Sequence, residues 1–169
     1  MPQKKTLERA KADKRQGKAA STQAGEFVKE QIDAVRAGKH GARSTKQAIA
    51  IGLSEARRAG VALKTPKKAS AATRHKAEHD SAAAHRQSSP SKESTAKRSR
   101  TTTRVLKKEG HEAASHASLS KQGHASASRR SAADRSAAAK KAAATKGAAG
   151  RSAAAKKAAR TRAARAASA

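Results

Sequence analysis

The sequence contains no cysteine, tryptophan or tyrosine, and Phe27 is its single aromatic residue. Without cysteine there is neither a disulfide framework nor thiol chemistry. Aromatic side chains are also the platforms on which proteins stack single-stranded nucleic acids, so their near absence disfavours that kind of binding. What chemistry remains must rest mainly on charge.

Long apolar runs are missing as well. No stretch approaches the roughly 18 apolar residues of a membrane-spanning helix. The N-terminal residues MPQKKTLERAKADKR are basic but are not followed by the apolar segment of a secretory signal. We therefore expect a cytoplasmic protein with no membrane partner.

Recognisable catalytic motifs are also absent: there is no G-x-S-x-G, no P-loop and no G-x-G-x-x-G. His75–His79 has the H-x-x-E-H form of an inverted zinc-protease site. Its flanks supply neither a third ligand nor an apolar stripe that would bury a metal, so we interpret it as a chance match. We expect no enzyme, no cofactor and no metal site.

Positive charge dominates what is there. The 169 residues include 40 Lys and Arg against 12 Asp and Glu, for a formal net charge of +28. Low hydrophobicity combined with high net charge leaves too little apolar surface to offset chain entropy, which predicts disorder over much of the chain. So large a charge indicates an acidic partner.

The bulky apolar residues are concentrated between residues 21 and 63, where they predict two helices. In the first, Ser21 or Thr22 is the expected N-cap and Gly38 the expected end. One helical stripe of that segment carries apolar side chains at Ala24, Phe27, Val28, Ile32 and Val35.

The second helix begins at a predicted capping box, in which Gln47 reaches back to the amide of the N-cap Ser44. Its apolar stripe is Ile49, Leu53 and Ala56, and Gly60 fits the left-handed position after a helix. Val61 and Leu63 are expected to fold back on the pair.

Two helices of this size form a marginal core. We expect support from an N-terminal helix around residues 7–16, from a homodimer through 21–63 or from bound DNA. The predicted fold is mostly α, a small helical hairpin domain with long, largely disordered basic tails whose Ala-rich C-terminal segments are helical or fold on binding. The expected segments are a basic N-terminal helix or arm (1–20), the αα-hairpin domain (21–63), a Ser/His/Lys-rich linker with short helical pieces (64–128) and an Ala/Lys/Arg repeat tail (129–169).

The tail repeats the nonapeptide RSAAAKKAA at 135–143 and 151–159, and Gly147 and Gly150 separate the two copies. Basic groups recur every five to six residues, so on a helix successive groups point to opposite sides. A membrane-surface helix needs one basic and one bulky apolar face instead. Charge on both flanks suits a segment lying between two phosphate strands.

The candidate DNA-binding residues are therefore basic groups of the tail, of the linker and of the loop between the two predicted helices. They are Arg129, Arg130, Arg135, Lys140, Lys141, Lys146, Arg151, Lys156, Lys157, Arg160, Arg162 and Arg165 in the tail, Lys67, Lys68 and Lys92 in the linker, and Lys39, Arg43 and Lys46 at the loop.

Two linker motifs, residues 65–68 (TPKK) and 89–92 (SPSK), have the form S/T-P-x-K. Together with the Ala/Lys/Arg/Ser tail, they resemble the C-terminal domains of linker histones and the linker-histone-like proteins of bacteria. That resemblance implies binding to the DNA backbone and a preference for narrow, A·T-rich minor grooves.

The segment from Ser21 to Val61 resembles small basic bacterial proteins labelled DNA-binding or plasmid stabilisation proteins. Such proteins often carry a second block similar to Leu106–Gly123 and an Ala/Arg/Lys tail. The resemblance implies a bacterial, DNA-associated protein.

These observations predict a non-enzymatic, nucleoid-associated protein that binds and compacts double-stranded DNA with little regard to sequence. The alternative is an interaction protein, for example in plasmid maintenance, whose hairpin binds a protein partner and whose tail localises it to DNA. Binding to double-stranded RNA is a further alternative.

Overall fold

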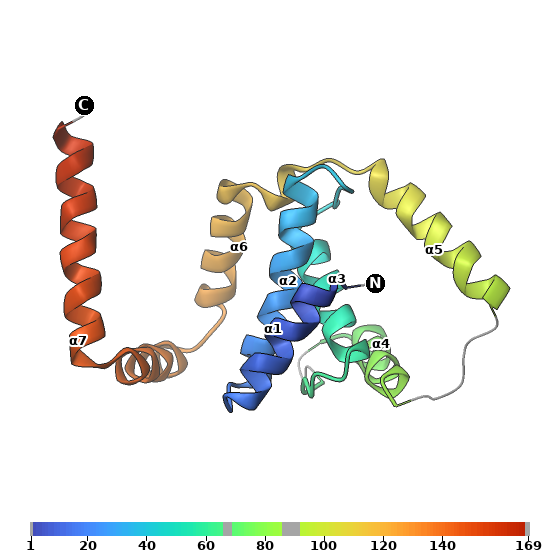
Figure 1. Cartoon of the computed structure of the whole chain (residues 1–169), viewed down its shortest axis with the longest axis horizontal. Helices are drawn as coiled ribbons and strands as arrows, with labels where there is room; N and C mark the ends of the chain where they lie inside the picture. The colour runs from blue at the N-terminus through green and yellow to red at the C-terminus, as the bar shows by residue number, and fades with distance from the viewer. Residues whose placement is uncertain (1, 66–68, 86–91, 168–169) are drawn as a thin grey trace. The chain divides into compact units, whose positions relative to one another are not determined.

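The computed structural model describes residues 2–65, 69–85 and 92–167 (Figure 1). Within these ranges the chain forms seven α-helices and one short 3-10 helix and no strand, which confirms the mostly α prediction. The elements are α1 (Lys4–Arg15), α2 (Ala20–Arg36), α3 (Thr45–Arg58), α4 (Ala71–Ala83), α5 (Lys92–Lys107), η1 (Glu112–Ala114), α6 (His116–Ser128) and α7 (Ala132–Ala167). They divide into two compact units, Met1–Gln122 and Gly123–Ala169.

The predicted hairpin is the centre of the first unit. Helices α2 and α3 pack against each other, and Phe27 and Val35 of α2 are fully buried. Packing is closest at Gly52, where an added Cβ would lie 2.7 Å from the Cα of Val28. Only a residue without a side chain permits this approach of the two backbones.

The buried stripe of α3 differs from the prediction. Its buried residues are Thr45, Ala48, Gly52 and Ala56, whereas Ile49 and Leu53 are only half-buried. The reason is steric, because small side chains let α2 and α3 approach where larger ones would hold them apart. The predicted stripe is therefore right at Ala56, and the buried face is shifted from it towards the smaller side chains.

The helix ends match the sequence signals in part. Gly38 and Gly60 adopt left-handed backbone after α2 and α3, and Val61 is buried behind Gly60, as predicted. The predicted N-cap of α2 is wrong, because α2 begins at Ala20 without a side-chain cap. In α3 the Ser44 hydroxyl accepts from the Gln47 amide at 3.2 Å.

The return bond of the predicted capping box is displaced by one residue. The Gln47 side-chain oxygen accepts from the backbone amide of Arg43 at 2.7 Å, not from that of Ser44. This hydrogen bond joins Arg43, at the end of the α2–α3 loop, to the first turn of α3.

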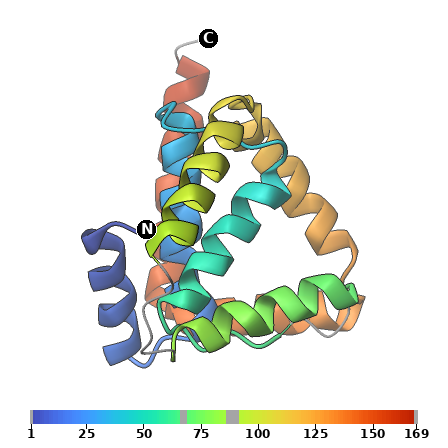
Figure 2. The same cartoon turned by 90° about the vertical axis from the view of Figure 1, so that its right-hand side faces the viewer.

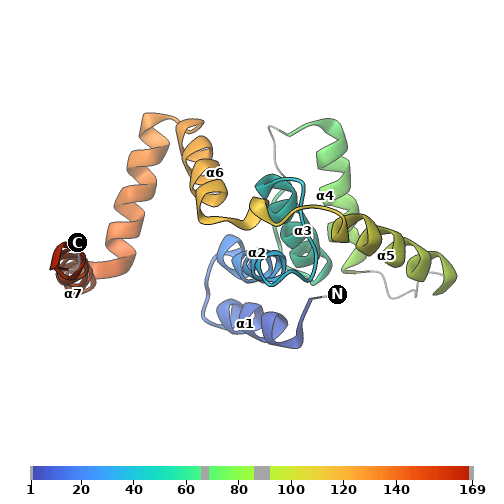
Figure 3. The same ribbon diagram turned by 90° about the horizontal axis from the view of Figure 1, so that it is seen from above.

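Helix α1 supplies the expected N-terminal support and lies along α2 (Figure 3). Its Ala10 joins the core cluster of Ala24, Phe27, Ala56 and Val61, with Leu7 packed against it. The salt bridge between Arg9 and Glu26 joins the two helices at 3.5 Å. The first core is therefore made by α1, α2 and α3 together.

A segment from the predicted linker completes a second core. Residues 106–114, the docked segment, place Ala113 and Ala114 against Val35, Ala42 and Ala48. The Gly41 amide donates to the Leu106 carbonyl at 2.8 Å, and the Ala42 amide donates to the Gly110 carbonyl at 3.0 Å. The first unit thus includes chain far beyond residue 63.

Helix α4 also returns to the hairpin and packs on α3 (Figure 2). Asp80 is 1% exposed and accepts hydrogen bonds from Ser54 at 2.7 Å, Arg58 at 2.9 Å and Lys76 at 2.8 Å. Burial acts to raise the pKa of Asp80, but the bonds from Lys76, Ser54 and Arg58 outweigh it and lower the pKa below its ordinary value.

Candidate nucleic-acid interface

Helix α7 of the second unit carries most of the predicted DNA-binding residues. Ser131 caps its start by accepting from the Asp134 amide at 3.0 Å, and its hydroxyl donates to the Asp134 carboxylate at 2.8 Å. Asp134 is the one acidic residue of the tail. It lies in the first helical turn, where a helix favours negative charge.

A kink at Gly147 divides α7 into two helical stretches, as the sequence predicts. Gly147 has φ 68° and ψ 171°, a conformation that is essentially restricted to glycine. Across the kink, the Arg151 guanidinium donates to the Ala143 carbonyl at 2.7 Å. That bond joins the two helical stretches across the kink.

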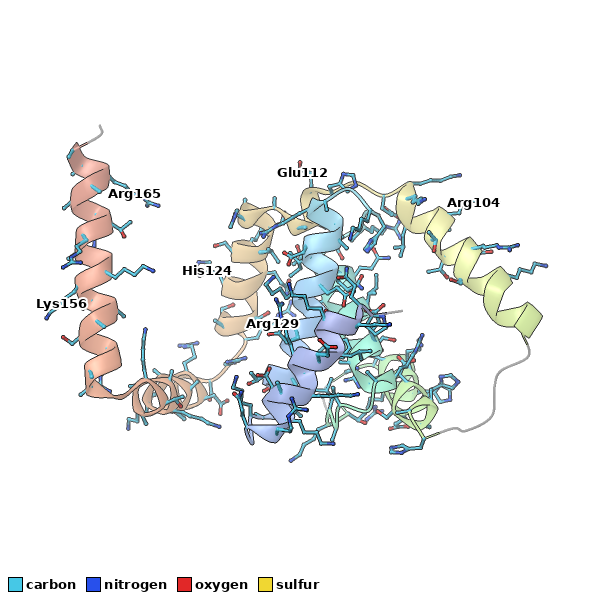
Figure 4. The ribbon with its side chains drawn as sticks, in the orientation of Figure 1. Arg104, Glu112, His124, Arg129, Lys156 and Arg165 are labelled. Atoms are coloured by element: carbon cyan, nitrogen blue, oxygen red, sulfur yellow. The ribbon has the colours of Figure 1, made fainter. Side chains whose placement is uncertain are left out.

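Basic side chains of the second stretch occupy two opposite faces. At about 100° per residue, Arg151, Arg162 and Arg165 share one face. The opposite face carries Lys156, Lys157 and Arg160. Figure 4 shows Lys156 and Arg165 extending from opposite sides of this stretch.

The first stretch repeats the arrangement with fewer groups. Arg135 and Lys146 fall on one face and Lys140 and Lys141 on the other, all of them exposed. Arg129 and Arg130 precede α7 and are exposed as well. The tail thus presents two lines of positive charge rather than one cationic face.

Some tail arginines also bind their own backbone. A guanidinium nitrogen of Arg135 donates to the Arg130 carbonyl at 2.9 Å, and the Arg162 Nε donates to the Ala158 carbonyl at 3.4 Å. Each of these exposed groups has further donors because a guanidinium carries five. They remain able to contact a phosphate.

Acidic residues of the first unit are engaged by other basic groups. Salt bridges join Asp13 to Lys18 at 2.6 Å, Asp33 to Lys29 at 2.6 Å and Asp80 to both Arg58 and Lys76. None of these salt bridges uses a basic group of α7. The basic side chains of α7 are exposed, so an external anion can reach them.

The predicted loop residues Lys39, Arg43 and Lys46 are exposed around the α2–α3 connection. The structure brings Lys107 and Lys108, which sequence reasoning missed, to the same place through the docked segment. Nothing in the spacing of a basic linker indicates which of its lysines will pack beside a loop more than sixty residues away.

The side chains of the three candidate lysines of the S/T-P-x-K motifs lie outside the described part of the structure. Lys67 and Lys68 lie outside the described residues, as does Pro90. Lys92 is the first residue of α5, but its side chain is outside the described set. These motif lysines therefore stay predictions.

A hollow between α1 and α2 measures about 300 Å³. Its lining is charged with both signs and includes Lys5, Arg9, Glu26, Lys29 and Glu30. Small-molecule sites are more typically apolar with a few convergent polar groups. No helix in the described ranges is long and apolar enough to cross a membrane.

A model for a family of unknown function (DUF6496) matches residues 11–69 of the chain. The match begins inside α1, spans the α2–α3 hairpin and ends before α4, so it includes neither the docked segment nor α7. No curated protein and no solved structure matches the chain. The similarity to this family therefore covers the hairpin and part of α1.

Proposed function

We propose that the protein is a non-enzymatic, nucleoid-associated DNA-binding protein that compacts double-stranded DNA without reading its sequence. The observation that carries this proposal is the pair of exposed basic faces on α7, which hold ten basic residues. With Arg129 and Arg130, the tail carries twelve basic residues against one acid. Contacts to phosphates supply affinity without sequence information.

The width of a helix determines where the tail binds. An α-helix with side chains is about 10–12 Å across, close to the 12 Å width of the major groove of B-DNA. Lying in that groove, α7 places one basic face towards each phosphate strand. The minor groove, about 6 Å wide, does not admit a helix.

The linker-histone resemblance implies a preference for A·T-rich minor grooves. Because a helix does not fit the minor groove, that preference requires an extended segment of chain. The S/T-P-x-K motifs suit it, since proline disfavours helix in the residue before it. We assign α7 to the major groove and the motif lysines Lys67 and Lys68 to the backbone or the minor groove, whereas Lys92, the first residue of α5, is assigned to the backbone alone.

Like charges along α7 repel one another when no anion is bound. We propose that the free tail frays and becomes largely disordered, and that DNA restores the helix by neutralising these groups. Alanine contributes the local helix propensity that makes this folding on binding inexpensive.

Salt titration of duplex affinity tests the proposal. If the tail contacts about eight phosphates, log K falls against log[salt] with a slope near −7. Replacing Arg135, Lys140, Lys141, Arg151, Lys156 and Lys157 by Gln in the full-length chain is expected to reduce that slope by about 5. Fluorescence anisotropy with duplexes of unrelated sequence measures both effects.

A variant that exchanges Lys and Arg at the same six positions is the matched control, because it keeps every charge and should keep the slope. An unchanged slope in the Gln variant would place the binding elsewhere. Tight, weakly salt-dependent binding to one sequence would favour a reader in the hairpin, and tighter binding to double-stranded RNA would change the partner.

A further inference from the structure

We infer that the first unit carries a second DNA-binding surface, formed where the docked segment meets the α2–α3 loop. This surface, the junction patch, is made by exposed basic residues of two segments that are far apart in the sequence. They are Lys39, Arg43, Lys46, Arg104, Lys107 and Lys108. The inference rests on the proposed DNA binding and adds a separate site to it.

Backbone contacts set the geometry of the junction patch. Gly41 donates to the Leu106 carbonyl, and a Cβ added at Gly41 would collide with the carbonyl oxygen of Glu109. Lys39 and Arg43 are each two residues from Gly41, which is at most about 7 Å of chain. Lys107 and Lys108 lie between the two contacting residues Leu106 and Glu109.

Two side-chain bonds anchor the other end of the docked segment. The buried Thr45 hydroxyl donates to the Ala113 carbonyl at 2.7 Å, and the Arg36 Nε donates to the Ala114 carbonyl at 2.9 Å. Ala114 is 0% exposed. The backbone that carries the basic groups is therefore held in position before a ligand arrives, which lowers the entropic cost of binding.

The charge balance favours an anion. The two segments of the junction patch contribute six basic groups, and none of the salt bridges found among the described residues uses them, although Lys39 also lines the hollow between α1 and α2 with Glu30 and Asp33. Glu109 and Glu112 follow on the same segment, so positive charge prevails. Arg104 precedes Lys107 by three residues, so the two lie on one side of the last turn of α5, and Lys108 directly follows the helix.

Duplex DNA suits this surface better than a protein partner. A protein interface usually has an apolar centre, whereas Val105, 52% exposed, is the only large hydrophobic residue classed as exposed in the described part of the chain. A line of phosphates needs only spaced cations. With α7 on one duplex and the junction patch on another, a single chain can bridge two DNA segments.

Bridging can be measured by retaining a fluorescent duplex on beads that carry a second, unlabelled duplex. The test variant replaces Lys39, Arg43, Lys107 and Lys108 by Gln in the full-length chain. We expect its bridging to fall at least about tenfold, since the second site is lost, while its affinity for one short duplex changes little because α7 is intact.

The matched control replaces Lys4, Lys5, Lys11 and Lys14, four exposed lysines of α1, by Gln and has the same net charge. It should bridge like the wild type. Gly41→Ala keeps every charge but displaces the docked segment, and it should also lose bridging, with circular dichroism reporting whether the helices persist.

The outcomes separate the two proposals. A wild type that does not bind duplex DNA refutes the proposed function itself. A wild type that binds without bridging, or a test variant that bridges undiminished, refutes the junction patch alone. Equal loss in the α1 control would show that total charge matters and that position does not.

Discussion

At the residue scale, two carboxylates of the first unit, the half-buried Glu55 of α3 and the buried Asp80 of α4, have pKa values shifted in opposite directions. Burial raises the pKa of Glu55, and a hydrogen bond from Gln31 at 2.8 Å offsets only part of that increase. Asp80 is also buried, but three donors from α3 and α4 surround it and lower its pKa. The number of hydrogen-bond donors around a carboxylate, and not the extent of its burial, therefore decides whether its pKa is lowered and its charged form is favoured in the folded protein.

Asp80→Ala should weaken the attachment of α4 to α3. Removing charge-assisted hydrogen bonds costs about 2 kcal/mol, and because Arg58 and Lys76 are about half-exposed they can hydrate once released. Urea unfolding at neutral pH measures the loss, and hydrogen exchange of α4 locates it. Asp33→Ala, which removes the exposed Lys29–Asp33 pair, is the control and should cost less than about 0.5 kcal/mol.

The same residue predicts a pH dependence. Because the folded-state pKa of Asp80 is lowered, its contribution is complete above the unfolded value of about 3.9 and is lost as the pH falls through the folded value. The stability difference between wild type and Asp80→Ala should therefore shrink below about pH 4. A constant difference down to low pH would contradict an ionic role.

At the element scale, the kink in α7 determines which basic groups share a face. Gly147 interrupts the helix between the two copies of the repeat, so the basic faces of one copy need not continue those of the other. The N-terminal copy is capped by Ser131 and Asp134, and the C-terminal one is joined to it through Arg151. Two short rods follow a curved or grooved surface more easily than one long rod.

Gly147→Ala should convert α7 into a continuous helix. Alanine is strained at this backbone conformation and is better than glycine by about 1 kcal/mol in a helix. The chain has no native cysteine, so Ser136→Cys and Ser152→Cys allow specific spin labelling. In DNA-bound protein, the label backbones should become separated by about 24 Å in a narrow distribution.

Gly150→Ala is the control for that measurement. Gly150 already has helical backbone, and an added Cβ would meet only the flexible Lys146 side chain at 3.1 Å. The substitution adds helix propensity without removing the kink, so the distance should stay as in the wild type. The same distance in all three proteins would contradict the account of Gly147.

At the scale of the whole molecule, a net charge of +28 acts on folding and on binding with opposite sign. Self-repulsion among the basic groups destabilises the compact state, and salt screens it over a Debye length that shrinks from about 10 Å at 0.1 M to 3 Å at 1 M. Phosphate contacts weaken over the same range.

The thermal unfolding midpoint of the free protein should therefore rise between about 0.05 and 0.5 M sodium chloride while DNA affinity falls. Circular dichroism measures the midpoint, and anisotropy measures the affinity. The rise should be smaller in the six-residue Gln variant of α7, which carries less charge. A midpoint that falls with salt would mean that attractive ion pairs outweigh the repulsion.

Local signals predicted much of the fold. Helical periodicity indicated α2 and α3, glycines at positions 38 and 60 marked their ends, and the repeat with Gly147 predicted two helical stretches in the tail. Each of these depends on residues within one or two turns. The predicted N-cap of α2 failed because the helix begins at Ala20, so that Ser21 and Thr22 lie inside its first turn.

The buried face of α3 and the docked segment could not be predicted in the same way. Hydrophobicity favours Ile49 and Leu53, but close packing of two backbones selects Gly52 and its small neighbours. Residues 106–114 contain little that is bulky and apolar, and their burial depends on the surface that Val35 and Ala48 present.

The sequence by itself determined the helical class, the excess of positive charge and the spacing of basic groups in the tail, because composition and periodicity are local properties. Only the tertiary structure decided that α4 and residues 106–114 return to the hairpin. Such contacts depend on shape and on single hydrogen bonds between distant residues, as at Gly41 and Asp80. They bring Lys107 and Lys108 beside Lys39 and Arg43, a proximity that no sequence pattern encodes.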